Sequence, residues 1–387
     1  MRFDGQQVGY PQGTMNGRLA GALLIPLALL LEGTHARSAL AQAWPPFVLV
    51  AGLLLIGLVA GRDGLFDAAA SRLVRLPGPP VVLVLACYTL VTVVTALLNL
   101  DTAAVFLTPV LVKAARRRGV DTEPFLYGAI FMANASSLFL PGSNLTNLLV
   151  RPGRHLSGAT FFTSMLPVAF AAPVITTAGL LIIHRRGLFS GEPADKPTGE
   201  SGEKPARSVR LGLGFWGALL AAGLIVALQN AALPVLAVGL VLLAWRTHRG
   251  ELPWRESLWW LDTPTLAGLF GLAVALGTLA RASAFPADLL HSPGTVATAA
   301  IAAVGSVVVN NLPAAVLLSS TTHLPMSALL LGLNVGPNLA VTGSLAVVLW
   351  WRSARAAGAT PSALAYSRQG LVLAPLALLG ALALNAI

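Results

Sequence analysis

The sequence contains few charged residues and almost no cysteine, and each shortage excludes a class of protein. Charged residues make up 10% of the 387-residue chain, whereas a soluble domain carries about 25%. The single cysteine, Cys87, excludes a disulfide within the chain and a thiolate cluster for a metal. The six histidines are scattered without metal-site spacing, and no Gly-rich loop ends in Gly-Lys-Ser or Gly-Lys-Thr. We therefore expect no enzyme, no cofactor, no metal site and no intrinsic use of ATP.

Apolar residues are abundant instead, at 56% of the chain. Residues 81–100 and 160–183 carry no charge, and each approaches the roughly 20 residues that a spanning helix needs. The net charge of +10 lies largely in short loops beside such segments, as in the cytoplasmic loops of membrane proteins, so nucleic acid is not expected as a partner. The sequence predicts an all-α polytopic protein of the cell membrane, with the lipid bilayer as its surroundings.

The chain divides into two membrane halves, 1–186 and 210–387. Residues 187–209 are rich in Gly, Pro, Glu, Lys and Ser, which is typical of a flexible cytoplasmic linker, although a surface loop has the same composition. Each half is expected to contain a helical hairpin, near 79–118 and 294–323, followed by a broken helix, 125–150 and 326–351. Further helices are expected near 19–31, 47–61, 62–76, 158–184, 211–229, 231–245, 262–280 and 366–386.

One polar pattern occurs in both halves, about two hundred residues apart and inside apolar segments. Asn99 to Thr102 in the first copy corresponds to Asn310 to Pro313 in the second, and Asn134 corresponds to Asn334. Polar residues in hydrocarbon are costly, so their presence indicates a function. A duplicated break in corresponding hydrophobic segments is typical of the binding site of a transporter.

The charges in the loops indicate how the two halves are oriented. Arginines precede the first hairpin, and Lys113 and Arg116–Arg118 end it, whereas the second hairpin ends at residues 319–323 without Lys or Arg. Cytoplasmic loops carry the excess of basic residues, so the two hairpins are expected to enter from opposite sides. The predicted fold is therefore two inverted repeats, each with a re-entrant hairpin and a broken transmembrane helix, whose tips meet near the midplane.

The polar residues at these breaks are the candidate site. Helix ends that point into a membrane protein offer free N–H groups, and Asn, Ser and Thr side chains add neutral donors and acceptors. Such a site suits a small hydroxyl-rich solute or an anion. The alternative for each residue is packing, because small polar side chains also join membrane helices. The predicted substrate-binding residues are Asn99, Thr102, Asn134, Ser137, Ser143, Asn144, Asn310, Asn311, Asn334 and Ser344.

Asp101 is the one acidic residue at a predicted hairpin tip. An intramembrane carboxylate can carry a proton or hold a cation, so we predict that Asp101 couples protons to the function of the site. The alternative interpretation is that Asp101 is the N-cap of the helix that follows it. Leu312 stands at the corresponding position of the second copy, so the two halves are not expected to share this role.

Four segments, at residues 100–109, 143–147, 310–313 and 332–345, resemble motifs of the arsenite/antimonite efflux permeases. These belong to the ion transporter superfamily, which also contains citrate and dicarboxylate carriers. The resemblance covers roughly residues 45–386. Leu100 occupies the position of the family's Asn before the Asp, and Asn99 lies one residue earlier. The four segments are Leu100-Asp101-Thr102-Ala103-Ala104 with Leu107-Thr108-Pro109; Ser143-Asn144-Leu145-Thr146-Asn147; Asn310-Asn311-Leu312-Pro313; and Gly332-Leu333-Asn334-Val335-Gly336-Pro337 with Thr342-Gly343-Ser344-Leu345.

The resemblance implies export of trivalent arsenic or antimony hydroxide, either in exchange for protons or driven by a partner ATPase. A homodimer is compatible with it. The same superfamily leaves two alternatives open, a citrate, dicarboxylate or other small-anion transporter and a sodium/proton antiporter. A membrane receptor that transports nothing is a further alternative, but it would leave the duplicated polar breaks unexplained.

Overall fold

The computed structural model describes residues 2–3, 6–7, 24–150, 157–189, 212–253, 263–283, 294–319 and 324–385. The predicted linker lies outside these ranges, except for the last residues of the short helix α9 (Arg185–Phe189). The expected helix near 19–31 is described only from residue 24, and residues 24–31 are helical.

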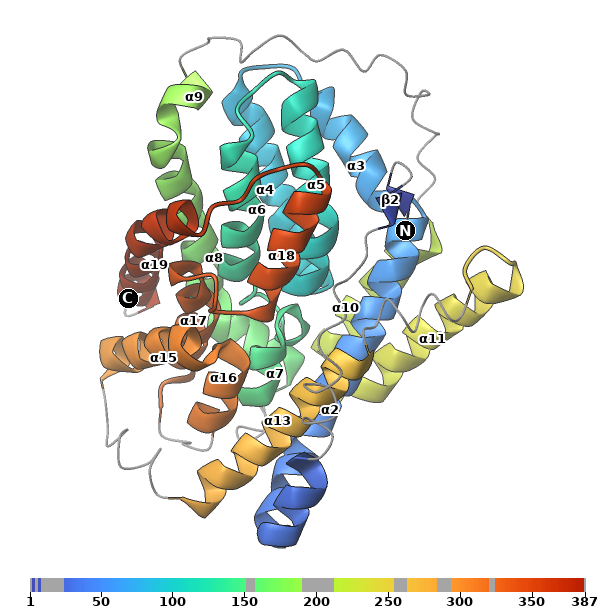
Figure 1. Cartoon of the computed structure of the whole chain (residues 1–387), viewed down its shortest axis with the longest axis vertical. Helices are drawn as coiled ribbons and strands as arrows, with labels where there is room; N and C mark the ends of the chain where they lie inside the picture. Colours follow the sequence, from blue (N-terminus) through green and yellow to red (C-terminus); the bar gives the residue numbers. More distant parts are fainter. Residues whose placement is uncertain are drawn as a thin grey trace.

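The predicted all-α fold is confirmed (Figure 1). Apart from a two-residue antiparallel ladder between β1 (Arg2–Phe3) and β2 (Gln6–Gln7), the described chain is built of helices and their connections. In the first half these are α2 (Gly33–Arg62), α3 (Leu65–Val74), α4 (Pro80–Leu97), α5 (Leu100–Arg117), α6 (Glu123–Ala135), η1 (Pro141–Ser143), α7 (Leu145–Val150) and α8 (Gly158–Ile183). In the second half they are α10 (Leu213–Ala227), α11 (Ala232–His248), α13 (Thr263–Ala282), α15 (Thr295–Val309), α16 (Asn311–Ser319), α17 (Met326–Val335), η3 (Gly336–Leu339), α18 (Leu345–Ala356) and α19 (Ala363–Asn385).

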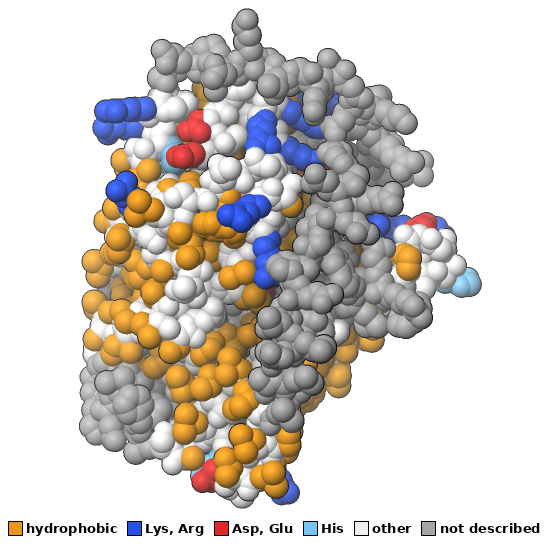
Figure 2. All heavy atoms as spheres, in the orientation of Figure 1, with side chains coloured by type: hydrophobic (Ala, Val, Ile, Leu, Met, Phe, Trp, Pro, Cys, Tyr) orange, Lys and Arg blue, Asp and Glu red, His pale blue; other side chains and the backbone are white. Residues whose placement is uncertain are grey.

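The protein is a multi-pass membrane protein, as its helix composition indicates. Among the described residues, four helices are long and apolar enough to cross a bilayer, namely α2, α4, α8 and α19. Shorter apolar helical stretches lie in α10, α11, α13 and α15. Large apolar side chains such as Val174 and Leu371 are exposed on these helices. Figure 2 shows hydrophobic side chains over the middle of the molecule, with most of the visible Lys and Arg towards one end. By the positive-inside rule, that end is expected to face the cytoplasm.

Helix α2 is longer than the sequence predicts. The expected span begins near residue 47, but the observed helix begins at Gly33 and continues through Pro45 and Pro46, which would normally interrupt a helix. Helices α10, α11 and α13 pack along α2 and bury much of it. This packing outweighs the local cost of the prolines, which is about 3 kcal/mol for a proline in a helix interior.

The helices form two groups. Helices α2, α10, α11 and α13 pack together on one side of the molecule, and we call them the scaffold helices (Figure 1). The two helical pairs α4–α5 and α15–α16, the interrupted segments α6–α7 and α17–α18, and the long helices α8 and α19 pack on the other side. We call this second group the hairpin body.

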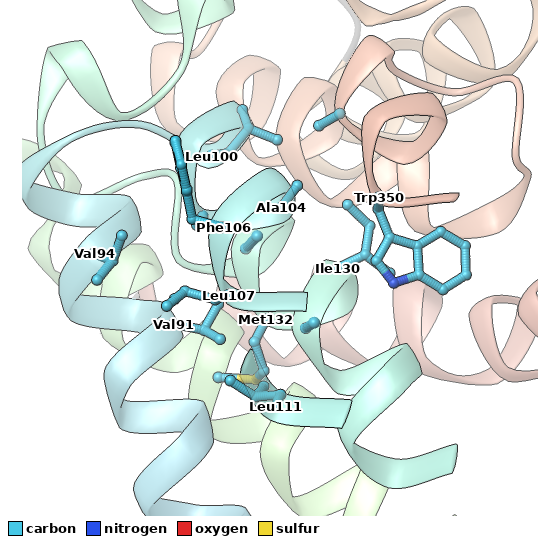
Figure 3. Packing of buried hydrophobic residues seen from close by; sticks show 14 of the residues in the cluster. Val91, Val94, Leu100, Ala104, Phe106, Leu107, Leu111, Ile130, Met132 and Trp350 are labelled. Atoms are coloured by element: carbon cyan, nitrogen blue, oxygen red, sulfur yellow. The ribbon is translucent and has the colours of Figure 1, made fainter. Parts of the chain in front are cut away.

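A buried apolar cluster joins α4, α5, α6 and α18 of the hairpin body (Figure 3). Val91 of α4, Leu107 and Leu111 of α5 and Met132 of α6 belong to one buried cluster, which Trp350 of α18 also joins. The indole N–H of Trp350 donates to the carbonyl oxygen of Leu126 at 2.8 Å, so a polar group is satisfied inside this core. The two interrupted segments are therefore packed against each other as one unit.

Candidate functional site

Four helices of the hairpin body begin at one cavity. Helices α5, α7, α16 and α18 each contribute their first residues to its wall, and the cavity volume is ≈ 190 Å³. The free N–H groups of a first helical turn and the positive end of the helix dipole favour electron-rich oxygen atoms. The lining residues are Val50, Leu54, Leu100, Asp101, Thr102, Val105, Phe106, Asn144, Leu145, Thr146, Leu266, Leu269, Asn310, Asn311, Leu312, Ser344, Leu345, Ala346, Leu349 and Arg352.

A polar side chain immediately precedes each of these four helices and accepts from its first turn. Oδ1 of Asn99 accepts from the N–H of Thr102 at 2.7 Å, and Oδ1 of Asn144 accepts from the N–H of Thr146 at 3.2 Å. Asn310 accepts from Leu312 at 3.3 Å, and Ser344 accepts from Val347 at 3.4 Å. The N-cap of α5 is therefore Asn99, so the alternative that Asp101 is the N-cap is wrong.

Asp101 and Arg352 bring opposite charges to the same cavity. Asp101 lies in the first turn of α5, where the helix dipole stabilises a carboxylate. Arg352 lies on α18 and is missing from the predicted site, because an arginine near a helix end reads as a cytoplasmic anchor. Its spacing from Leu345 and Leu349, seven and three residues, places the three on one face of a helix, and this signal could have identified it.

Two polar atoms at the start of α5 have no hydrogen-bond partner among the described residues. They are Nδ2 of Asn99 and Oγ1 of Thr102, and both side chains are 1% exposed. A buried polar group without a partner costs about 1–3 kcal/mol. Since Thr102 lines the cavity, a solute or water there can supply a partner to its hydroxyl group.

The tip of the second helical pair is strained. Asn310 joins α15 to α16 with φ 76° and ψ 150°, a region that is almost exclusive to glycine. Its Nδ2 donates to the carbonyl oxygen of Thr342 at 3.2 Å, and the N–H of Asn311 donates to that of Gly343 at 2.9 Å. These contacts fix the tip to the loop that precedes α18.

The two interrupted segments cross through a buried amide network. Oδ1 of Asn334 accepts from Oγ of Ser137 at 2.6 Å and also from Nδ2 of Asn144. Nδ2 of Asn334 donates to Oδ1 of Asn147 at 2.9 Å, and Nδ2 of Asn134 donates to Oδ1 of Asn338 at 2.8 Å. All six side chains are at most 3% exposed, so most of their hydrogen-bonding capacity is used inside the protein.

The two repeats attach their loops to their hairpins in the same way. Oγ of Ser143, before α7, donates to the carbonyl oxygen of Ala96 at 3.2 Å. Oγ1 of Thr342, before α18, donates to the carbonyl oxygen of Val307 at 3.1 Å. Ala96 and Val307 both lie in the last turn of the first helix of their pair.

The predicted site residues thus separate into three sets. Thr102, Asn144, Asn310, Asn311, Ser344 and the predicted coupling residue Asp101 line the cavity. Asn99 and Ser143 lie directly behind it, as a helix cap and a loop anchor. Asn134, Ser137 and Asn334 lie in the buried crossing and not in the cavity wall. The sequence does not distinguish these sets, because all three consist of small polar residues at helix breaks.

One group of side chains away from the cavity has the residue types of a metal site. Asp121, Glu123 and His184 each place a ligand atom within 4.8 Å of the others. The two carboxylates are exposed, and the Nε2 atom of His184 already lies 3.1 Å from Oε1 of Gln369. We assign no metal function to this group.

Comparison with known proteins gives one family match and several related sequences. Residues 16–346 match the family model described as citrate transporter. The chain is 25% identical over 371 residues to an arsenical pump membrane protein of Yersinia enterocolitica, with 85% of this chain and 83% of the relative covered. It is 24% identical over 359 residues to a 46 kDa membrane protein of Mycobacterium leprae, with 85% and 82% covered.

A solved structure has the same fold. The YdaH transporter of Alcanivorax borkumensis matches with a TM-score of 0.58 at 15% identity, over 95% of this chain and 97% of that one. At this identity the likeness concerns the fold alone. The expectation that the chain is not an enzyme is consistent with these matches, which are to transporters and membrane proteins.

Proposed function

Since the chain belongs to the citrate transporter family, we propose that it exports arsenite or antimonite across the membrane in exchange for protons. The observation that carries this proposal is the convergence of four helix starts and one carboxylate, Asp101, on a single cavity. Trivalent arsenic and antimony form small neutral hydroxides in water. Backbone N–H groups and the side chains of Thr102, Asn311 and Ser344 can bind their oxygen atoms without a counter-charge.

The similarity to arsenical pump membrane proteins supports this choice of solute. The composition of the cavity wall agrees with it, because a thiol is not needed to bind a metalloid as its hydroxide. The chain's one cysteine, Cys87, is fully buried in α4 and does not line the cavity. The wall therefore offers oxygen and nitrogen donors only.

Asp101 is the proposed proton carrier. A proton taken up from outside would neutralise its carboxylate, and release of that proton to the cytoplasm would restore the charge. The substrate and the proton would occupy the same cavity at different stages, which couples the two flows. A partner ATPase and a homodimer stay predictions that this cycle does not require.

A small-anion carrier is the second candidate, and Arg352 favours it. An arginine in the cavity wall, together with the positive ends of four helix dipoles, suits a carboxylate or an oxyanion. A transport assay in membrane vesicles distinguishes the two candidates when citrate, succinate and phosphate are supplied beside arsenite. Uptake of an organic anion with no metalloid flux would replace the first proposal by the second.

Transport in everted membrane vesicles tests the proposal. Vesicles that contain the protein should accumulate arsenite when a proton gradient is imposed, and a protonophore should abolish the accumulation. Expression in a host that lacks its own arsenite pump should also restore growth in arsenite. Absence of metalloid accumulation in vesicles that contain folded protein would contradict the proposal.

The variant Asp101→Asn tests the coupling role. It keeps the shape and hydrogen-bonding capacity of the side chain but cannot carry a proton. We expect arsenite binding to be retained, while accumulation driven by the proton gradient falls to the level of empty vesicles. Asp101→Glu is the matched control, since it keeps the titratable group and should retain part of the coupling. Unchanged gradient-driven accumulation in Asp101→Asn would exclude Asp101 as the proton carrier.

A further inference from the structure

The cavity has two sides that differ in structure. Helices α5 and α18 run from the cavity towards the arginine-rich end, and α7 and α16 run towards the opposite end (Figure 1). Val105, Phe106, Leu349 and Arg352 extend the cavity wall along α5 and α18. The cavity therefore extends in the cytoplasmic direction, between these helices and the scaffold helices.

On the opposite side, the scaffold helices pack against the hairpin body. Helix α13 packs against α16, and α2 packs against α7. Nε2 of Gln42, on α2, donates to the carbonyl oxygen of Leu149 in the last turn of α7 at 2.8 Å. The same amide group donates to Oγ of Ser319, the last residue of α16, at 3.2 Å. One scaffold side chain thus contacts the far ends of two helices whose first residues line the cavity.

Arg281, on the scaffold helix α13, also takes part in this arrangement. Its Nη2 donates to Oε1 of Gln42, and its Nη1 donates to the carbonyl oxygen of Gly277 at 2.7 Å. The amide of Gln42 therefore accepts from a guanidinium group with its oxygen and donates to a helix C-terminus with its nitrogen. In this series of hydrogen bonds each bond is polarised in the same direction. The direction runs from the guanidinium cation of Arg281 to the negative end of the α7 dipole.

We propose that Gln42 and Arg281 form a latch that closes the cavity on the outer side, and we call it the outer latch. In a transporter the solute must reach the cavity from each side in turn. The hydrogen bonds of Gln42 to Leu149 and Ser319 therefore have to break when the cavity opens outwards. The geometry fits that role, because the contact joins the scaffold helices α2 and α13 to α7 and α16, the two helices that lead outwards. The proposal rests on the transport activity of the family and not on the choice of solute.

The amide group of Gln42 suits a contact that has to break and form again. The hydrogen bonds of Gln42 to the carbonyl oxygen of Leu149 and the hydroxyl of Ser319 are strong enough to favour one conformation and weak enough to exchange with water. A full ion pair across the two groups of helices would need a charge on α7 or α16. Gln42 instead transmits the charge of Arg281 to those helices without a covalent or ionic link.

Cysteine accessibility from the two sides of the membrane tests the outer latch. A single cysteine at Leu345, which lines the cavity, reports on access, and the native Cys87 is fully buried and should not react. A small membrane-impermeant methanethiosulfonate is applied to everted and to right-side-out vesicles. With the latch intact, Leu345→Cys should react faster from the cytoplasmic side. No transport substrate is needed, so failure of the metalloid proposal does not affect the result.

Two variants of Gln42 separate the latch from a merely structural role. Gln42→Ala removes both halves of the bridge, whereas Gln42→Glu keeps an acceptor for Arg281 but has no N–H for Leu149. Both should raise the ratio of outer to inner labelling rates roughly five- to thirty-fold, the range that one or two lost interactions produce. Ser38→Ala, one turn earlier on an exposed face of α2, is the control and should leave the ratio unchanged.

The result that would overturn the proposal is an unchanged labelling ratio in both Gln42 variants when they purify as folded protein. Faster labelling of Leu345→Cys from outside than from the cytoplasm, with Gln42 and Arg281 unchanged, would overturn it as well. Gln42→Glu is nearly isosteric with the native side chain, so we expect it to fold. Arg281→Gln should raise the ratio in the same direction, because the guanidinium donor is lost.

Discussion

Asn310 shows how a single residue can hold a helix tip in a strained conformation. Its backbone lies in a region that glycine adopts freely, yet the side chain contributes bonds to Thr342 and to Leu312 that glycine cannot make. The strain therefore persists because the tip is attached to the loop before α18 by side-chain and backbone bonds. The residue type is a compromise between backbone freedom and attachment.

Substitutions at Asn310 separate these two contributions. Asn310→Gly and Asn310→Ala both lose the side-chain bonds, but only alanine keeps the strain. We expect Asn310→Ala to be less stable than Asn310→Gly by about 1–3 kcal/mol, the usual cost of such a conformation. Thermal unfolding of the two variants in the same detergent measures the difference. Equal unfolding temperatures would show that the backbone of this tip is not strained in solution.

Asn334 is predicted here to have a structural role. Removal of its side chain in Asn334→Ala leaves buried amide groups of Asn144 and Asn147 without their partner, whereas the hydroxyl of Ser137 keeps the carbonyl oxygen of Asn134. Each unsatisfied group costs about 1–3 kcal/mol, so the variant should unfold at a clearly lower temperature. The matched substitution Ser344→Ala, at the cavity, should instead change solute affinity with a smaller loss of stability. A change in affinity but not in stability for Asn334→Ala would place Asn334 in the binding site.

Sequence reasoning identified residue types at the site better than their individual roles. The recurrence of Asn and Ser at both breaks is visible in the sequence, and six of the predicted residues line the cavity. The distinction between cavity and crossing depends on which faces of two interrupted helices meet, and that is a tertiary property. Gln42 and Arg281 lie on segments without any repeat signal, so nothing local marks them.

At the level of helices, apolar runs and polar breaks predict most boundaries well. The observed α4 and α5 begin and end within two residues of the expected pair 79–98 and 102–118, and α8 matches 158–184 equally well. Helix α2 departs furthest from its expected range of 47–61, because it begins at Gly33 and continues through Pro45 and Pro46. Packing by three neighbouring helices decides its length, and that packing is not visible in local sequence.

The contact between α19 and the break at η3 depends on one glycine. A Cβ atom at Gly370 would lie 1.7 Å from the carbonyl oxygen of Asn338, a backbone atom that cannot move alone. Gly370→Ala should therefore displace the break and destabilise the protein by at least about 1–3 kcal/mol. Gly380→Ala on the same helix is the control, since its Cβ would meet only the end of the Ile175 side chain. Similar unfolding temperatures for both variants would contradict the close packing at Gly370.

The whole molecule consists of the scaffold helices and the hairpin body, and the interface between them surrounds the cavity. Gly57 of α2 lies directly against Thr102 of α5, and a Cβ atom at Gly57 would lie 3.7 Å from that of Thr102. This separation is within the range of a disulfide, about 3.5–4.5 Å. The two groups of helices can therefore be linked covalently beside the proposed binding site.

The double variant Gly57→Cys/Thr102→Cys tests whether transport requires relative movement of the two groups. Oxidation should form the disulfide and stop transport almost completely, and a reductant should restore the rate of the reduced double variant. The single variants, treated in the same way, control for effects of each substitution on binding. Undiminished transport after complete cross-linking would show that α2 and α5 do not separate during the cycle.

The charges in the cavity also bear on the response of the protein to membrane voltage. Asp101 and Arg352 are the charged residues among those that line the cavity, so the wall has no net charge with Asp101 ionised and one positive charge with Asp101 protonated. Moving one charge across a potential of 100 mV changes the free energy by about 2.3 kcal/mol. In the proposed export cycle, the outward step carries a neutral hydroxide, so an interior-negative potential would leave this step unaffected. The same potential would pull the protonated, empty cavity back towards the cytoplasm. The voltage would then accelerate the return step alone, and rates measured at potassium-clamped potentials would reveal it.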